Sequence, residues 1–183
     1  MTKLLAIAAS IRPESLNKQL LTVAVAAAKQ AGAEVTTLDF ADHDAPNVHV
    51  YSGPLPANMQ AIADALLQHD GLILATPEYN WSIPGALKNL IDWMSIDTRA
   101  PLKNRTALLL SATPSTRGGV SALLHTRVPL EVLGMWVYPQ VIGIGQAGSK
   151  LGSDTLKNEK EQKHLATCVT DFVRVTNTLS NHA

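Results

Sequence analysis

The sequence has a single cysteine, Cys168, among its 183 residues, which excludes a disulfide bond within the chain. Scarce cysteine is typical of proteins in a reducing compartment, and we therefore expect a cytoplasmic protein. Cys168 falls in an amphipathic helical pattern near the end of the chain. A buried structural thiol is a better interpretation of that position than a nucleophile.

Net charge and long apolar runs are also missing. Fifteen lysines and arginines balance fifteen aspartates and glutamates, so nucleic acid and acidic membranes are not expected partners. No apolar run reaches transmembrane length, and the run at 4–9 is too short for a secretory signal, so we interpret it as a buried strand. With no internal repeat and 46% apolar residues, the sequence predicts a single domain over residues 1–183.

Metal-ligand spacings and known phosphate motifs are absent too. The six histidines, at positions 43, 49, 69, 125, 164 and 182, show no paired spacing, so no metal site is expected. The stretch Gly143-Ile144-Gly145-Gln146-Ala147-Gly148 has the spacing of a dinucleotide-binding turn, but no further strand with a terminal acid follows it. We interpret it as an ordinary loop.

What the sequence does contain is a regular alternation of strand-like and helix-like segments, with a loop-rich stretch at 39–56. The expected strands are 4–8, 33–38, 72–75, 106–111 and 136–144, and the expected helices are 16–31, 58–69, a segment around Leu87, 121–133 and 155–179. This order predicts an α/β fold, a flavodoxin-like doubly wound five-stranded parallel sheet in the order 2-1-3-4-5 with helices on both faces.

The stretch 76–93 organises the rest of the chain. Pro77 ends the buried third strand because it lacks a backbone donor, and Ser82 and Pro84 are expected at the start of the next helix, Ser82 as its N-cap. Apolar side chains then recur at helical spacing, at Leu87, Leu90, Ile91 and Met94. The polar and aromatic residues 78–81 thus lie where open α/β sheets bind ligands.

A second polar loop follows the first strand and contains Ser10, Arg12, Ser15 and Asn17. A helix N-terminus attracts phosphate, and Arg12 adds a charged fork of donors. The alternative is a plain capped helix, with Ser15 as the cap and Arg12 in solvent, which leaves Ser10 and Asn17 unexplained. We therefore expect a monophosphate such as that of FMN to bind here.

A third polar loop, residues 111–119, follows the fourth strand. Gly118 and Gly119 allow the backbone to approach a flat ligand closely. A mobile loop without function is the alternative, but three such loops at one sheet edge indicate a binding site.

Three motifs together resemble the NADPH-dependent FMN reductase family, which includes bacterial quinone and chromate reductases and azoreductases. They are Ser10-x-Arg12-x-x-Ser15-x-Asn17, then Pro77-Glu78-Tyr79-Asn80-x-Ser82-x-Pro84-Gly85-x-Leu87-Lys88-Asn89-x-Ile91-Asp92-Trp93, then Gly118-Gly119. The resemblance implies non-covalent FMN, with Ser10, Arg12, Ser15 and Asn17 on its phosphate. It implies that Pro77, Glu78, Tyr79, Asn80 and Trp81 border the ring, and that Ser111, Gly118 and Gly119 form the opposite wall. Ala9 and Trp81 depart from the family pattern, since smaller residues are common at both positions.

By that resemblance the protein is an FMN-dependent NAD(P)H oxidoreductase. Hydride would pass from NAD(P)H through FMN to a small-molecule acceptor that is quinone-like, an azo compound or a metal oxyanion. One open flavin face would serve both substrates, which predicts ping-pong kinetics. No protein group is needed for the hydride step, so no catalytic residue is expected and Glu78 is interpreted as a structural carboxylate.

The family also implies a homodimer or homotetramer, with Trp81, Ile83 and Trp93 supplying apolar surface near the contact. The alternatives are a flavodoxin-like electron carrier, which zero net charge disfavours, a flavin reductase that releases reduced FMN to a monooxygenase, or a flavin-sensing partner protein.

Overall fold

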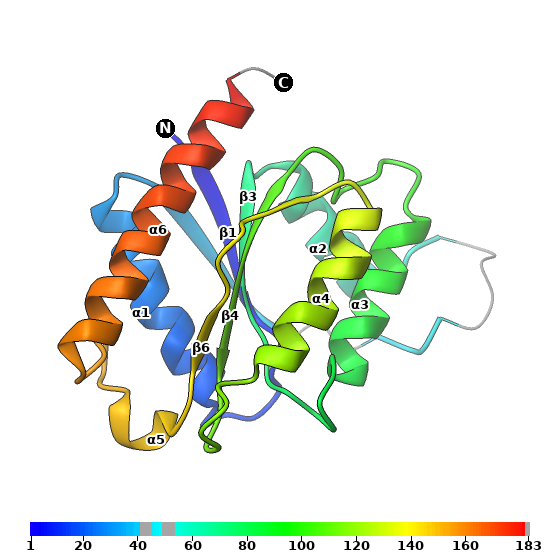
Figure 1. The fold of residues 1–183 in the computed structure, drawn as a ribbon. Helices are drawn as coiled ribbons and strands as arrows, with labels where there is room; N and C mark the ends of the chain where they lie inside the picture. Colours follow the sequence, from blue (N-terminus) through cyan, green and yellow to red (C-terminus); the bar gives the residue numbers. More distant parts are fainter. Residues whose placement is uncertain (41–44, 49–53, 182–183) are drawn as a thin grey trace.

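A parallel β-sheet forms the centre of the computed structural model, which describes residues 1–40, 45–48 and 54–181 (Figure 1). The strands are β1 Lys3–Ala8, β2 Glu34–Asp39, β3 Gly71–Ala75, β4 Thr106–Ala112, β5 Trp136–Val137 and β6 Ile142–Ile144. The helices are α1 Leu16–Gln30, α2 Ala57–Leu67, α3 Gly85–Ile96, α4 Val120–Val132, α5 Ala147–Lys150 and α6 Glu159–Ser180. Strand order β2-β1-β3-β4-β5, with all pairs parallel, confirms the predicted flavodoxin-like topology. Of the expected loop 39–56, residues 41–44 and 49–53 lie outside the described part.

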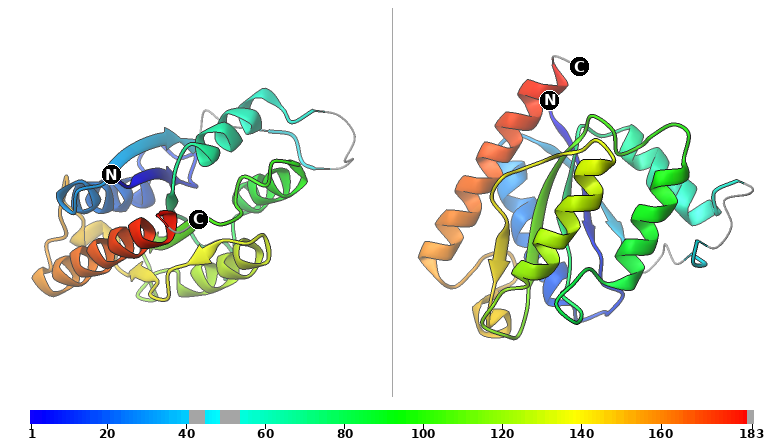
Figure 2. Two further views of the ribbon diagram at one scale, coloured as in Figure 1. Left: turned by 90° about the horizontal axis from the view of Figure 1, so that it is seen from above. Right: turned by 45° about the vertical axis from the view of Figure 1, so that its right-hand side comes forward.

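Helices cover both faces of the sheet. Helices α1 and α6 lie on one face, while α2, α3 and α4 lie on the other (Figures 1 and 2). The central strands β1, β3 and β4 therefore have no solvated face, which explains why their middle residues form apolar runs rather than alternating with polar residues.

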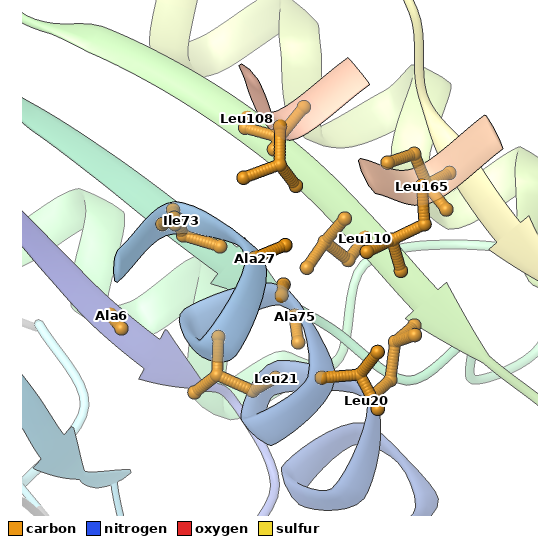
Figure 3. Close-up of a cluster of buried hydrophobic side chains, with 14 of the residues drawn as sticks. Ala6, Leu20, Leu21, Ala27, Ile73, Ala75, Leu108, Leu110 and Leu165 are labelled. Carbon is orange, nitrogen blue, oxygen red and sulfur yellow. The ribbon is translucent and has the colours of Figure 1, made fainter. Parts of the chain in front are cut away.

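The two-residue period of a strand divides the core into two clusters. On β4, Leu108 and Leu110 face α1 and α6, whereas Leu109 faces α2, α3 and α4. Figure 3 shows the first cluster, in which Ile73, Ala75, Leu108 and Leu110 of the sheet meet Leu20, Leu21 and Ala27 of α1 and Leu165 of α6. Burying each leucine contributes about 1.5–3 kcal/mol.

Local signals set the ends of α1. The Ser15 hydroxyl accepts hydrogen bonds from the N–H groups of Asn17 and Lys18 at 3.1 and 3.3 Å, which caps the helix start. At the other end Gly32 adopts a left-handed φ of 87°, and Ala33 donates its N–H to Ala28. This pattern is a Schellman motif, in which a glycine in the left-handed conformation ends the helix.

The expected fifth strand, 136–144, is wrong in detail because the structure divides it in two. The strand β5 pairs with the beginning of β4 and β6 pairs with its end. Between them the interval from Val137 to Ile142 runs alongside the shorter interval from Ala107 to Leu110, and it contains Pro139, which cannot donate to a ladder. The extra residues bulge out and interrupt the pairing.

The last helix also begins later than the expected residue 155. Asn158 is its N-cap, and its side-chain oxygen accepts from the N–H of Glu161 at 3.1 Å. The preceding residues fold back, since Leu151 and Leu156 form an isolated antiparallel bridge. Within the described residues no helix combines the length and the apolar character needed to cross a bilayer.

Candidate functional site at the carboxyl edge of the sheet

The three polar loops leave the sheet at the same edge, the lower one in Figure 1. Backbone hydrogen bonds extend the sheet one step past the strand ends: Ala9 donates to Ala75 at 2.8 Å, Thr76 to Leu110 at 2.9 Å and Thr113 to Ile144 at 3.0 Å. Because the strands end level, the loops that follow β1, β3 and β4 begin side by side. The structure thus has the convergence of loops that the sequence predicts.

The loop after β3 contains a tight turn with an unusual residue. The backbone groups of Tyr79 and Ser82 exchange two hydrogen bonds of 3.0 and 3.1 Å, and the two residues between them, Asn80 and Trp81, have φ values of 50° and 65°. Two successive positive φ values define a type I′ turn, whose second position usually holds glycine. Trp81 is therefore held in a conformation that costs a bulky residue about 1 kcal/mol or more.

The prediction that Ser82 caps α3 is wrong. The helix has Pro84 at its N-cap position and no side-chain cap bond. The backbone of Ser82 is occupied in the turn, and its hydroxyl lies 3.1 Å from Nδ1 of His125 on α4. The tight turn thus directs the hydroxyl toward a neighbouring helix, which residue preferences along the chain do not reveal.

Glu78 joins this loop to α4. Its Oε2 accepts a hydrogen bond of 3.1 Å from the N–H of Ala122, in the first turn of α4. The N-cap of α4 is Gly119, which has no side chain to do this, so the carboxylate of Glu78 supplies both the missing acceptor and a favourable charge. This contact supports the structural interpretation of Glu78.

Two other residues of the central motif anchor the chain that follows β2. The Asn89 amide donates to Ala45 and Pro46 at 3.3 and 3.2 Å, and its oxygen accepts from Val48 at 3.0 Å. The indole of Trp93 donates to the Pro46 carbonyl at 2.8 Å and is buried. Trp93 therefore does not supply the exposed subunit surface that the sequence suggests, because its ring is used inside the fold.

The loop after β1 divides into residues with internal partners and residues without them. Ser15 caps α1, and the Asn17 amide bonds both the carbonyl and the N–H of Ala112, at 3.1 and 2.9 Å. Those contacts tie the start of α1 to the end of β4. Among the described residues, Arg12 has no hydrogen-bond or ion-pair partner, and its side chain is exposed. Arg12 is thus an exposed cation beside the start of a helix, while Ser10 is buried next to it.

The loop after β4 is packed by close backbone approach. A Cβ added at Gly119 would lie 2.1 Å from the hydroxyl oxygen of Ser111, and one at Gly118 would lie 2.6 Å from the backbone of Gly143. Both glycines also have positive φ, of 72° and 66°. The hydroxyl of Ser111 is buried, and within the described chain no group satisfies it.

The glycine pattern at 143–148 receives an explanation here. A Cβ at Gly145 would lie 2.2 Å from the carbonyl oxygen of Thr116, and Gln146 donates its N–H to Ser115 at 2.8 Å. The pattern spans the end of β6, a turn at Gly145 and Gln146, and the start of the short α5, which was not expected. Only its middle is therefore the loop that the sequence predicts. Its glycines let this segment dock against the loop after β4.

A cation–π contact connects the loops after β3 and β4. The guanidinium carbon of Arg117 lies 4.0 Å from the centre of the Trp81 ring, and both residues are exposed. Sequence reasoning placed Trp81 at the site and did not identify Arg117. A positive side chain directly before the glycine pair was the available signal.

In the described part of the chain, neither the cysteine nor a cluster of metal ligands adds chemistry to this edge. Burial raises the pKa of the Cys168 thiol, which lies on α6 and is inert in that state. No group of three potential metal ligands occurs within residues 1–40, 45–48 and 54–181; His43, His49 and His182 lie outside them.

The residues at this edge fit FMN. A buried hydroxyl and an arginine near a helix start, neither with a partner among the described residues, and two glycines at a loop wall suit a flat ligand with a phosphate.

Comparisons with known proteins agree with that fit. The model of the family NADPH-dependent FMN reductase matches residues 2–149. A quinone reductase of Escherichia coli is 38% identical over 90 residues, and the match spans about half of each chain, 48%. An NAD(P)H-dependent FMN reductase of Pseudomonas aeruginosa is 32% identical over 131 residues, which cover 72% of this chain and 70% of the relative.

Solved structures show the same fold. FerB, a flavoenzyme NAD(P)H:(acceptor) oxidoreductase from Paracoccus denitrificans, superposes with a TM-score of 0.84 at 24% identity, over 97% of this chain and 98% of that one. A flavodoxin from Bacillus cereus gives 0.64 at 16% identity, over 94% and 98%. From the three motifs, the strand order and the family match together, we conclude that this chain belongs to the NADPH-dependent FMN reductase family.

Proposed function

We propose that the protein binds FMN at the carboxyl edge of its sheet and uses NAD(P)H to reduce a quinone-like acceptor. The observation that carries this proposal is the convergence of the three family motifs on one edge, where Asn17 is bonded to the end of β4 and Glu78 to the start of α4. The matched relatives named for quinone and FMN reduction support the substrate class.

The residues of this edge would hold the cofactor in a fixed orientation. Arg12 would pair with its phosphate, the Ser111 hydroxyl would gain a partner, and the backbone of residues 78–81 would border the ring. When bound, FMN supplies the hydride-transfer chemistry. The hydrogen bonds of Glu78 to α4 and of Asn17 to β4 hold the three loops in fixed positions relative to one another. The side chains of this edge would therefore position the cofactor rather than transfer protons.

An absorbance spectrum of the purified protein tests the cofactor. The protein should be yellow, or become yellow with FMN, and should bind FMN more tightly than riboflavin because riboflavin lacks the phosphate. Anaerobic NAD(P)H should then bleach the flavin within seconds. Equal affinity for riboflavin would argue against the phosphate site, and a flavin that NAD(P)H leaves oxidised would indicate an electron carrier.

Steady-state kinetics test how the substrates share the site. If donor and acceptor use one face of the ring in turn, double-reciprocal plots with benzoquinone should be parallel. Metal oxyanions and azo compounds are further acceptors to assay. Intersecting lines would require two separate sites.

We also propose that the protein is at least a dimer in the cytoplasm, with α4 at the contact. Four apolar residues of α4 are exposed and recur every four residues, so they form one line along the helix: Val120 at 43%, Leu124 at 51%, Val128 at 62% and Val132 at 80%. Replacing Val128 with glutamate should convert the dimer to monomer in light scattering, with Leu179→Glu on α6 as the control. A wild-type monomer at working concentration would contradict the proposal.

A further inference from the structure

The backbone conformation of Trp81 costs the fold stability, and the exposed indole returns little of it by packing. Its φ of 65° belongs to a region where glycine is free and a bulky residue is strained, yet its side chain remains 54% exposed. Burial therefore does not offset the strain. An exposed indole in a strained turn at a ligand-binding edge points to a contact with a bound molecule.

Arg117 is placed over that indole. Its guanidinium lies 4.0 Å from the ring centre, and within the described residues no carboxylate pairs with it. Glu78, the acid of the neighbouring turn, is bonded to Ala122 instead. Within the described residues no hydrogen bond engages the N–H groups of Arg117, and a guanidinium matches a carboxylate, sulfonate or phosphate.

Both side chains stand on well-fixed backbone. Two hydrogen bonds close the turn that carries Trp81, and the loop of Arg117 is docked through Gly118 against Gly143. Fixed groups lose little conformational freedom when a ligand binds, so they are suited to discriminate between ligands.

We propose that Trp81 and Arg117 form a subsite for a flat aromatic ring that carries a negative charge. The ring stacks on the open part of the indole, and the charged group accepts hydrogen bonds from Arg117. The ligand is either an anionic acceptor or the adenosine 2′-phosphate part of NADPH, which share this chemistry. The inference rests on the proposed function, because it assumes that both substrates approach this edge.

The test compares matched ligands on FMN-loaded protein. The acceptors are 1,4-naphthoquinone and its 2-sulfonate, each assayed with NADH and with NADPH, and calorimetry measures the binding of naphthalene-2-sulfonate, which undergoes no redox reaction. The variants are Arg117→Gln, Arg117→Lys and Trp81→Leu, and Arg174→Gln on α6 is the control for loss of an exposed arginine. Light scattering checks that all variants keep the wild-type assembly.

Arg117→Gln removes a charge-assisted hydrogen bond to the anionic group. We therefore expect it to weaken the binding of naphthalene-2-sulfonate about tenfold or more and to lower kcat/KM for the sulfonated quinone by a similar factor. The neutral quinone should be unaffected. Arg117→Lys should lose less affinity than Arg117→Gln, because lysine has the charge without the planar fork. Trp81→Leu should weaken the binding of both the sulfonated and the neutral ring. The Arg174→Gln control should match wild type.

The outcomes separate the possible ligands and the possible failures. If Arg117→Gln lowers only the ratio of kcat/KM with NADPH to kcat/KM with NADH, the nucleotide phosphate is the ligand of the subsite. Three quantities decide against the subsite: the dissociation constant of naphthalene-2-sulfonate, the ratio of kcat/KM for the sulfonated and the neutral quinone, and the ratio of kcat/KM with NADPH and with NADH. If all three stay within about twofold of wild type in the variants, the subsite is refuted. Failure of the proposed function is distinct, because wild-type protein would then hold no flavin or fail to bleach with NAD(P)H, and both proposals would fall.

Discussion

The two edges of the sheet are held together in different ways. At the amino edge polar groups are paired: the Arg105 guanidinium donates to the carbonyls of Leu66, Leu67 and His69, and the hydroxyls of Thr106 and Thr176 lie 2.7 Å apart. At the carboxyl edge the backbones approach closely through glycine, Trp81 is strained, and the Ser111 hydroxyl has no partner in the described chain.

This difference indicates which edge serves stability and which serves binding. Satisfied polar groups stabilise the fold, whereas unpaired groups and strained residues persist where a ligand completes them. Removing a paired polar group, such as Arg105 or Glu78, should therefore cost stability, whereas removing the unpaired Arg12 at the carboxyl edge should cost ligand affinity. Adding an atom should be damaging where a glycine leaves no room for a Cβ. Five substitutions examine these expectations.

The largest effect is expected from Gly119→Ala. The new methyl would lie within 2.1 Å of the Ser111 hydroxyl oxygen, at a residue with φ of 72°. Overpacking and the left-handed conformation together should lower the free energy of unfolding by about 2–4 kcal/mol. Urea unfolding measures it, and Gly148→Ala is the control, because nothing lies within 4 Å of its added Cβ. An equally small loss of unfolding free energy in both variants would show that the loop after β4 is loosely packed.

Arg105→Ala should be the next most damaging change. It removes a half-buried cation whose guanidinium satisfies carbonyls at the end of α2. We expect a loss of about 2–3 kcal/mol in unfolding free energy with little change in FMN affinity. Weakened FMN binding with intact stability would reverse the assignment of the two edges.

Arg12→Ala is the matching test at the carboxyl edge. Because Arg12 is exposed and has no partner among the described residues, its loss should leave stability within about 0.5 kcal/mol of wild type. Loss of a charge-assisted contact should instead raise the dissociation constant of FMN about 10- to 100-fold. Fluorescence titration measures it, and an unchanged constant would remove Arg12 from the phosphate site.

Glu78→Gln should have a smaller effect. An amide still accepts from the N–H of Ala122 but loses the charge that favours a helix start, so about 0.5–1 kcal/mol of stability should be lost. Activity should largely remain if FMN is bound. Loss of hydride transfer at full FMN occupancy would show that the carboxylate takes part in the reaction.

Trp81→Gly should change stability only a little, and in the opposite direction. Relief of the left-handed strain is worth about 1 kcal/mol and is partly offset by the lost cation–π contact, so unfolding free energy should stay equal or rise slightly. Thermal unfolding measures it. A marked loss of stability would mean that the indole packs as part of the fold.

The sequence by itself determined the strand order and the three loops. Apolar runs at 72–75 and 106–111 can be buried on both faces only inside a parallel sheet, and parallel strands place their following loops at one edge. The glycine that ends α1 and the serine that begins it act locally, so they too could be predicted. Side chains whose partners are near in sequence are the ones that patterns capture.

Only the tertiary structure decided the partners of residues far apart in the chain. Asn17 bonds Ala112, Glu78 bonds Ala122, and Arg117 stacks on Trp81, and none of these pairs is related by a helical or strand period. The break between β5 and β6 has the same origin, because it depends on the length of β4 alongside it. Such contacts arise when the fold brings loops together, and their energies depend on distances that a one-dimensional pattern does not contain.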